Sequence, residues 1–493
     1  MATRGLTPGP PAPRPTTTRD RLSGWWSLGI VLLVVAFVLF GYGQVNGNRT
    51  ITGFLAAPAL LLITWPIIRS QQKRDLGFDL AGIMFAGLAA KFIGVFVRLW
   101  VVEDVYDGNG DSTQYHIIGR SFVDQIRSLD FDLETTRPVP GTGFMQLLTG
   151  YIYAVVGSYK FVGFMVFGFF AYLGAFFFYK AFETAIPDGD RKKFAILVFF
   201  WPSLLYWPSA IGKEAWVLFG LGIAAYGLAR AYTGRRGGFP LLMLGALIAY
   251  GPRPHIAILV VTAGAVGLMM SWIFKTEDHV RSASLFSKVL GVIVIVGFGA
   301  WLAPQVASFL NVDDVGGSGF TEALDAAEVR TDEGGSSFAA ARVESPADYP
   351  WAFVTVLFRP LPFEVNNAQS AVSALEGLML LGLFFVSTRR LLRLPASVMR
   401  SPYAAMAVGF VFSFVYVFST IGNFGILARQ RTQVIPFLFV LVSLPLAEEV
   451  RIKREEYRKR QAEARMARRK ERSIVEHPKL DVVTRGLGPP RKR

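Results

Sequence analysis

An acidic segment in the first quarter of the chain has the residue types needed for general-base chemistry. Residues 103–116 read EDVYDGNGDSTQYH. The two glycines of this stretch break any helix, so Asp104 falls on a turn and Asp111 begins the next helix. A carboxylate in such a position can accept a proton from the hydroxyl of an acceptor molecule. We therefore expect Asp111 to be the leading catalytic base, with Asp104 second.

Asp111 also has a structural interpretation, as the N-cap of a helix in which Gln114 completes a capping box. The cap and the base are compatible roles. A divalent cation could bind the carboxylates of this segment, but carboxylates in a glycine-rich loop are too common to assign a metal site. The neighbouring groups that could hydrogen-bond a substrate are Tyr115 and His116.

Charged residues in four later segments could hold an anionic substrate. The segments are residues 207–214, 251–255, 359–364 and 425–431. Arginine and lysine bind phosphate and stabilise the charge of a leaving group. Structural alternatives are a glutamate at a helix start, a lysine that reaches the membrane surface, a proline kink and a bound lipid headgroup. The candidates are Glu214 as an additional catalytic carboxylate and, for substrate binding, Lys213, Arg253, His255, Arg359, Glu364, Arg429 and Arg431.

The composition indicates which elements must position these groups. The chain has 493 residues, of which 52% are hydrophobic and 18% charged, and its mean hydropathy is +0.40. Soluble domains carry about 25% charged residues, so we expect an all-α polytopic membrane protein rather than a soluble enzyme. The absence of cysteine excludes disulfides, thiolate metal sites and thiol nucleophiles.

The net charge of +15 is concentrated at the two ends of the chain. Residues 1–24 carry +3 and residues 448–493 carry +8, so the remaining 423 residues carry +4. Basic ends around an apolar body indicate two cytoplasmic termini. We expect a disordered, proline-rich tail over 1–24, a transmembrane catalytic domain over 25–447 and a basic helical tail over 448–493. We expect membrane lipids and no nucleic acid as partners of these tails.

About twelve apolar segments are long enough to be membrane spans or nearly so. Basic segments between them set the orientation, which leaves residues 103–142 and 305–370 as the large outer loops. Residues 143–157 cannot be a further span without inverting every later loop, so we interpret them as re-entrant or interfacial. The expected spans are 25–43, 51–68, 80–102, 160–180, 194–210, 214–231, 239–250, 256–274, 286–304, 371–387, 403–421 and 432–447.

The acidic segment and the residues that follow resemble the C superfamily of membrane glycosyltransferases. The pattern DSTQYH from Asp111 resembles the Asp-x-x-x-Tyr pattern of that superfamily, and PVPGTGFM at 138–145 extends the likeness, which covers roughly residues 95–235. It implies a multi-helix membrane fold, a polyprenyl-phosphate-linked sugar donor and a catalytic carboxylate at Asp104 or Asp111, with Glu214 as a second acid. The chain departs from the superfamily in having two spans before the acidic loop and no large soluble C-terminal domain.

We therefore expect an inverting glycosyltransferase of a bacterial plasma membrane. It would use a polyprenyl-phosphate-linked sugar donor and a glycan or glycolipid acceptor at an extracytoplasmic site, building cell-envelope glycan. The sequence ARQR at 428–431 also resembles polytopic exopolysaccharide polymerases, so a polymerase acting on lipid-pyrophosphate-linked glycans is the alternative. A lipid or ion transporter is a third reading, favoured only by Lys91 and Arg98 at membrane depth. The acidic segment 312–348 could close over a glycan acceptor.

Overall fold

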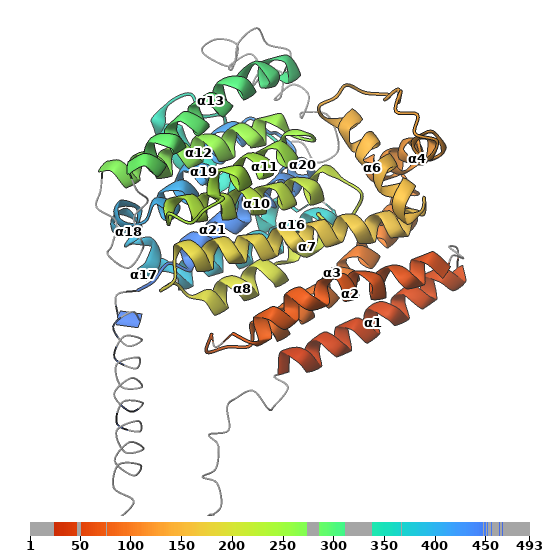
Figure 1. The fold of residues 1–493 in the computed structure, drawn as a ribbon, viewed down its shortest axis with the longest axis horizontal. Helices are drawn as coiled ribbons and strands as arrows, with labels where there is room; N and C mark the ends of the chain where they lie inside the picture. The colour runs from red at the N-terminus through yellow and green to blue at the C-terminus, as the bar shows by residue number, and fades with distance from the viewer. Residues whose placement is uncertain are drawn as a thin grey trace, which may run out of the picture. The chain divides into compact units, whose positions relative to one another are not determined.

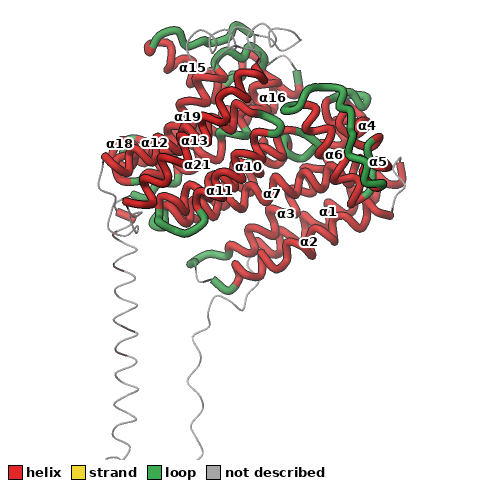
Figure 2. Tube along the Cα trace, turned by 45° about the horizontal axis from the view of Figure 1, so that its top comes forward, coloured by secondary structure: helices red, strands yellow, loops and turns green. Residues whose placement is uncertain are grey.

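The computed structural model describes residues 24–46, 51–74, 76–273, 285–310, 338–365 and 367–446, together with positions 448, 449, 451, 455, 463 and 466. The regular elements in these ranges are helices joined by loops (Figures 1 and 2). The chain forms two units, Met1–Leu444 and Pro445–Arg493. The predicted tail 1–24 and most of the predicted acidic segment 312–348 lie outside the described residues, which include Gly24 and residues 338–348 of these two segments.

The helices of the first unit fall into an N-terminal set, a central set and a C-terminal set. The N-terminal set is α1 (Gly24–Asn46), α2 (Ile51–Gln72), α3 (Leu80–Trp100) with the π-helical turn η1 (Val101–Val105), α4 (Asp111–Ser121), α5 (Val123–Arg127) and α6 (Thr142–Val156). The central set is α7 (Lys160–Ala185), α8 (Arg191–Phe200), α9 (Pro202–Tyr206), α10 (Lys213–Tyr232), α11 (Gly238–Tyr250), α12 (Pro254–Ile273) and α13 (Leu285–Leu310). The C-terminal set is η2 (Pro346–Asp348), α15 (Tyr349–Phe358), η3 (Pro362–Glu364), α16 (Ala368–Val386), α17 (Thr388–Leu391), α18 (Leu394–Arg400), α19 (Pro402–Phe418), α20 (Phe424–Arg431) and α21 (Ile435–Val442).

Among the residues that the structure describes, five helices are long and apolar enough to cross a membrane: α3 with η1, α7, α10, α12 and α16. The pair α20 and α21, bent by 56°, would make a sixth if it is one span. Several other expected spans are shorter or broken helices; the segment expected at 194–210, for example, is interrupted where Pro202 ends α8 and starts α9. The helical membrane class is therefore supported, and the twelve-span topology stays a prediction.

Large apolar side chains remain on the outer surface of the spanning helices. On α16, Val372 is 67% exposed, and Phe385 and Val386 are at least 80% exposed. Extended apolar surface of this kind is typical of proteins that face lipid. The described chain is therefore suited to a membrane.

Glycine allows close contact between the helices of the central set. A Cβ on Gly222 of α10 would lie 2.4 Å from the carbonyl oxygen of Gly174 on α7, which is too close for any side chain. Small residues at such crossings let helix backbones approach each other in membranes. This contact holds α10, which carries two of the predicted site residues, close against α7.

Ion pairs show that α3 and α7 run in opposite directions. Lys160 at the start of α7 pairs with Glu103 of η1, which continues α3, and Arg74 before α3 pairs with Glu183 near the end of α7 at 2.8 Å. We call these two ends of the unit the Glu103 end and the Glu183 end. Figure 1 shows α4 and α6 beside α3 and α7 at the Glu103 end.

Both flanks of α6 lie at the Glu103 end. Gly141, which precedes α6, donates its backbone N–H to the carbonyl of Gly251 at 2.8 Å, and Lys160, which follows α6, contacts Glu103. A helix whose two ends return to the same end of the bundle adds no crossing. The apolar helix Thr142–Val156 is shorter than a full span, and the interpretation of 143–157 as re-entrant or interfacial stays a prediction.

The basic segments predicted to be cytoplasmic gather at the Glu183 end. Lys193 donates to the hydroxyl of Ser387 at 2.7 Å and to the carbonyl of Val442 at 3.0 Å. Arg390 pairs with Asp190 at 3.5 Å. Segments far apart in the sequence are thus joined at the end opposite to the predicted outer loops.

The second unit is described at a few helical positions. Arg451 and Glu455 form an (i, i+4) ion pair at 3.9 Å, and both side chains are exposed. Such pairs lie on one face of a helix.

Candidate functional site

Two ion pairs at the Glu103 end join four segments of the chain. Arg253 Nη2 lies 2.7 Å from Glu214 Oε1, and Arg429 Nη1 lies 3.3 Å from Asp111 Oδ2. Lys213 is within electrostatic range of all four of these residues. We call Asp111, Lys213, Glu214, Arg253 and Arg429 the charged cluster. Its residues are up to 318 positions apart in the sequence, so the fold alone brings them together.

The connection between α9 and α10 presents Lys213 and Glu214 at the first turn of α10. Gly212, with extended backbone, precedes that turn. A glutamate at a helix start is stabilised by the free N–H groups and dipole of the helix. The structural role expected for Glu214 is therefore present beside its pairing with Arg253.

Two cations of α3 hold this connection in place. Lys91 Nζ donates to the carbonyl of Leu204 at 2.7 Å. Arg98 donates to the Tyr206 hydroxyl at 2.9 Å, and its guanidinium lies over the rings of Tyr206 and Trp207. Since both side chains bind the α9 segment, they act here as anchors for the loop that carries Lys213 and Glu214.

Arg253 lies in the break between α11 and α12. The prolines on either side of it end one helix and begin the next, as expected. The side chain is 8% exposed. Nη2 binds Glu214, whereas Nη1 is buried without a hydrogen-bond partner among the residues that the structure describes. The guanidinium therefore has a donor group left for a further acceptor at the cluster.

Asp111 is the first residue of α4, and its carboxylate faces Arg429 rather than its own helix. Gly110 is the N-cap, and no side chain caps this helix. The capping box predicted for Asp111 and Gln114 is therefore wrong, because the long-range pairing with Arg429 takes the carboxylate instead. The Asp111 side chain is 69% exposed and that of Arg429 33% exposed, so a substrate hydroxyl can reach this carboxylate.

Tyr115 belongs to the environment of the cluster, and its neighbour His116 does not. The Tyr115 side chain is buried; burial, followed by the charges of Asp111 and Glu214, raises the pKa of its hydroxyl. Tyr115 therefore stays protonated and can donate a hydrogen bond. His116 Nδ1 lies 2.8 Å from the Tyr153 hydroxyl. Burial, with the cations Lys160 and Arg120 nearby, lowers the pKa of His116 to about 4, so its ring is neutral.

His255 lies in the first turn of α12, two positions after Arg253. Its ring lies 6.1 Å from that of Phe418, and it is within electrostatic range of Arg253 and Lys213. His255 therefore borders the charged cluster.

Arg359 and Glu364 form a separate pair. Arg359 Nε donates to Glu364 at 2.9 Å, and its guanidinium lies over the rings of Phe338 and Phe424 at 4.4 and 5.3 Å. Burial alone would raise the pKa of Glu364, but hydrogen bonds from Arg359 and from the Leu361 N–H lower it overall. Arg359, held by Glu364, thus joins Phe338, which precedes α15, to Phe424 of α20.

Arg431 points into the helix bundle, away from Arg429. Its side chain is buried, and Nε donates to the carbonyl of Val356 at 2.7 Å. Its nearest charge of opposite sign is Glu376 of α16, which accepts the Ser203 N–H at 3.1 Å. Glu376 was not among the sequence candidates, although a lone carboxylate inside the apolar segment 371–387 is a recognised signal for function or buried pairing.

Asp104 lies on η1 and is exposed. Within the described ranges it has no ion pair or hydrogen-bond partner, and it is not brought to the charged cluster. The same ranges hold no group of three or more histidine or carboxylate side chains placed to bind a metal ion. Asp104, Asp107 and Asp111 are therefore not grouped in this way.

Comparison with known proteins adds no relative to this description. The chain matches no protein-family model, no curated protein and no solved structure.

Proposed function

We propose that the protein is a membrane glycosyltransferase that moves a sugar from a polyprenyl-phosphate carrier to a glycan or glycolipid acceptor. One observation supports this most: an exposed carboxylate, Asp111, lies beside Arg429 in a cluster that also contains Arg253 and Lys213. A base for a hydroxyl and cations for a phosphate are the two requirements of the reaction.

The reaction proceeds by direct displacement with inversion. Asp111 accepts the proton of the acceptor hydroxyl, whose oxygen attacks the anomeric carbon of the donor sugar. The bond from that carbon to the phosphate oxygen breaks, and polyprenyl phosphate leaves with the electron pair. Arg429 keeps the carboxylate oriented and can exchange to a phosphate oxygen as charge develops there.

Arg253 and Lys213 bind the phosphate from the buried side. Arg253 Nη1 has no partner within the described chain, and the pairing of Nη2 with Glu214 fixes the plane of the guanidinium. In this proposal Glu214 is a positioning residue for Arg253, since its carboxylate is already paired and largely buried. Tyr115 donates a hydrogen bond within the same site.

The reaction takes place at the outer face of a bacterial plasma membrane. The support is that the charged cluster lies at the Glu103 end, whereas the basic segments near Lys193 and Arg390 lie at the Glu183 end. Positive charge favours the cytoplasmic side. Both termini are then cytoplasmic, and the membrane itself holds the lipid carrier against the site.

The proposal is tested by supplying radiolabelled polyprenyl-phosphate sugars to membranes with and without the protein and identifying the product. Asp111→Asn should lower transfer by at least about a hundredfold, within the range for loss of a general base. Asp104→Asn is the matched control, because it removes an exposed carboxylate seven residues earlier and should leave transfer within about twofold of wild type.

Arg429→Ala should raise the apparent KM for the donor by more than that for the acceptor. Full transfer by Asp111→Asn would refute the role of this residue. Extension by preassembled repeat units from a pyrophosphate carrier would instead identify a polymerase.

A further inference from the structure

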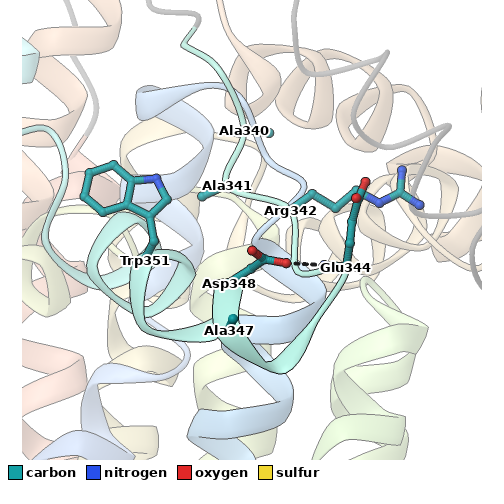
Figure 3. Close-up of a pocket in the computed structure, with 7 residues that line it drawn as sticks. All are labelled: Ala340, Ala341, Arg342, Glu344, Ala347, Asp348 and Trp351. Atoms are coloured by element: carbon teal, nitrogen blue, oxygen red, sulfur yellow. Dashed lines mark hydrogen bonds between the residues drawn. The ribbon is translucent and has the colours of Figure 1, made fainter.

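A polar hollow outside the charged cluster lies between the segment that follows residue 337 and the start of α15. It has a volume of about 540 Å³ and is lined by Ala340, Ala341, Arg342, Glu344, Ala347, Asp348 and Trp351. This volume falls within the range of small-molecule sites. Figure 3 shows Asp348 between the indole of Trp351 on one side and the side chains of Arg342 and Glu344 on the other.

The lining combines an aromatic surface with fixed hydrogen-bonding groups. Trp351 is 55% exposed. The Asp348 carboxylate accepts hydrogen bonds from the Ser345 N–H and hydroxyl at 2.7 and 2.9 Å and from the Glu344 N–H at 3.2 Å. These bonds all use Oδ2 and hold the carboxylate in one orientation. Within the described residues, Oδ1 and the Glu344 side chain have no hydrogen-bond partner, so both can accept hydrogen bonds from a ligand.

These groups favour a neutral sugar over a phosphate or an apolar ligand. The C–H face of a pyranose or furanose ring packs against an exposed indole, and its hydroxyls donate to carboxylates while accepting from a guanidinium. A phosphate would be repelled by Glu344 and Asp348. A hydrocarbon chain would leave those charges without hydrogen-bond partners.

The hollow is joined to the helix that carries Arg429. The Phe338 N–H donates to the Gly422 carbonyl at 2.7 Å, and the Phe338 ring stacks on Phe424 with centroids 4.2 Å apart. Arg359 lies over both Phe338 and Trp351. From Phe424 to Arg429 is only about 8 Å along α20, from a rise of roughly 1.5 Å per residue. Phe338 and Arg359 lie between α20 and Trp351, so a chain of several sugars would be needed to contact both places.

We propose that this hollow binds a short neutral oligosaccharide, the part of the acceptor glycan behind the residue that reacts. The identification of this oligosaccharide as the acceptor rests on the proposed transferase function. Glycan binding itself can be measured without any transfer. The site selects acceptors by length: glycans of several residues contact Trp351, whereas a single sugar on its lipid does not.

The test is binding of defined linear arabinan, mannan, galactan and glucan oligosaccharides of two to six residues to the full chain in lipid nanodiscs. Trp351→Ala should weaken the best ligand by about tenfold, equivalent to roughly 1.4 kcal/mol, and Trp351→Phe should retain most of the affinity. Glu344→Gln should also weaken binding by about tenfold, through loss of a charged acceptor. The matched control is Trp272→Ala on α12, since Trp272 is 50% exposed but distant in sequence from the hollow.

Unchanged oligosaccharide affinity in both Trp351→Ala and Glu344→Gln would overturn the inference. So would a loss of affinity in Trp272→Ala equal to that in Trp351→Ala, or a wild type that binds none of the oligosaccharides. If Trp351→Ala fails to fold, Glu344→Gln decides the question. Asp111→Asn separates the two proposals, because it should abolish transfer and leave oligosaccharide binding intact. Binding that depends on Trp351 without any transfer would retain the glycan site and reject the transferase.

Discussion

Replacing Glu214 by glutamine removes the only ion-pair partner that the described structure gives to Arg253. The two side chains are 12% and 8% exposed, and their atoms lie 2.7 Å apart. Removing one member of a buried pair leaves the other charge uncompensated, at a cost of about 3–5 kcal/mol. Because Nη1 of Arg253 already lacks a partner, we expect Glu214→Gln to fall within this range.

Replacing the other member of the pair, Arg253, should lower the free energy of unfolding by less. In Arg253→Met the Glu214 carboxylate keeps the N-terminus of α10 and the nearby charge of Arg429 as stabilising neighbours. We expect Arg253→Met to lower the free energy of unfolding by about 2–4 kcal/mol. The loss in the double variant should be smaller than the sum of the two single losses by at least about 1 kcal/mol.

The assay is equilibrium unfolding in mixed micelles, followed by tryptophan fluorescence, for wild type, both single variants and the double variant. Asp111→Asn is the control for a more exposed pair, since the Asp111 and Arg429 side chains are 69% and 33% exposed; its loss should cost below about 1 kcal/mol. A Glu214→Gln loss no larger than that of Asp111→Asn, or strict additivity of the single variants, would refute the reasoning.

Two further predictions concern groups outside the charged cluster. Burial, followed by the charges of Lys160 and Arg120, lowers the pKa of His116 from 6.5 to about 4. Between pH 6.5 and pH 4 the unfolded chain therefore binds a proton at His116 that the folded chain does not bind. The contribution of neutral His116 to stability should therefore be fully present above pH 6.5 and should fall as the pH drops towards 4. The measurement is the free energy of unfolding as a function of pH, in which His116→Gln should remove this part of the acid dependence. An unchanged pH profile in His116→Gln would contradict the prediction. Arg359→Met should lower the free energy of unfolding by about 1–3 kcal/mol through loss of the Glu364 pair and the aromatic contacts, and Arg359→Lys should recover part of it; equal stability of Arg359→Met and wild type would show that the contacts contribute nothing.

The helix breaks of the site could be predicted because their causes are local. The prolines on either side of Arg253 end α11 and begin α12 as expected. Pro202 is just as visible in the sequence and interrupts the span expected at 194–210. A hydropathy window averages over such a residue, which explains why the expected span is divided in two.

The partners of the charged residues could not be predicted from local rules. The period of a helix indicates that Arg429 and Arg431 point in different directions, but not that Asp111 receives the first and Val356 the second. The capping box at Asp111 is wrong for the same reason, because a contact across 318 positions outweighs a local motif. Tyr115 and His116 are adjacent in sequence, and only packing separates their environments.

The two arginines of α20 also limit how this helix can move. They are about 200° apart around the helix axis, with Arg431 hydrogen-bonded inside the bundle and Arg429 partly in solvent. Rotation of α20 about its axis would break the hydrogen bond from the buried guanidinium of Arg431 to the carbonyl of Val356. In the proposed reaction, the exchange of Arg429 from Asp111 to a ligand is therefore confined to rotation about side-chain bonds, which occurs in picoseconds to nanoseconds for exposed residues. Such a site responds to its ligand without waiting for a helix to rearrange.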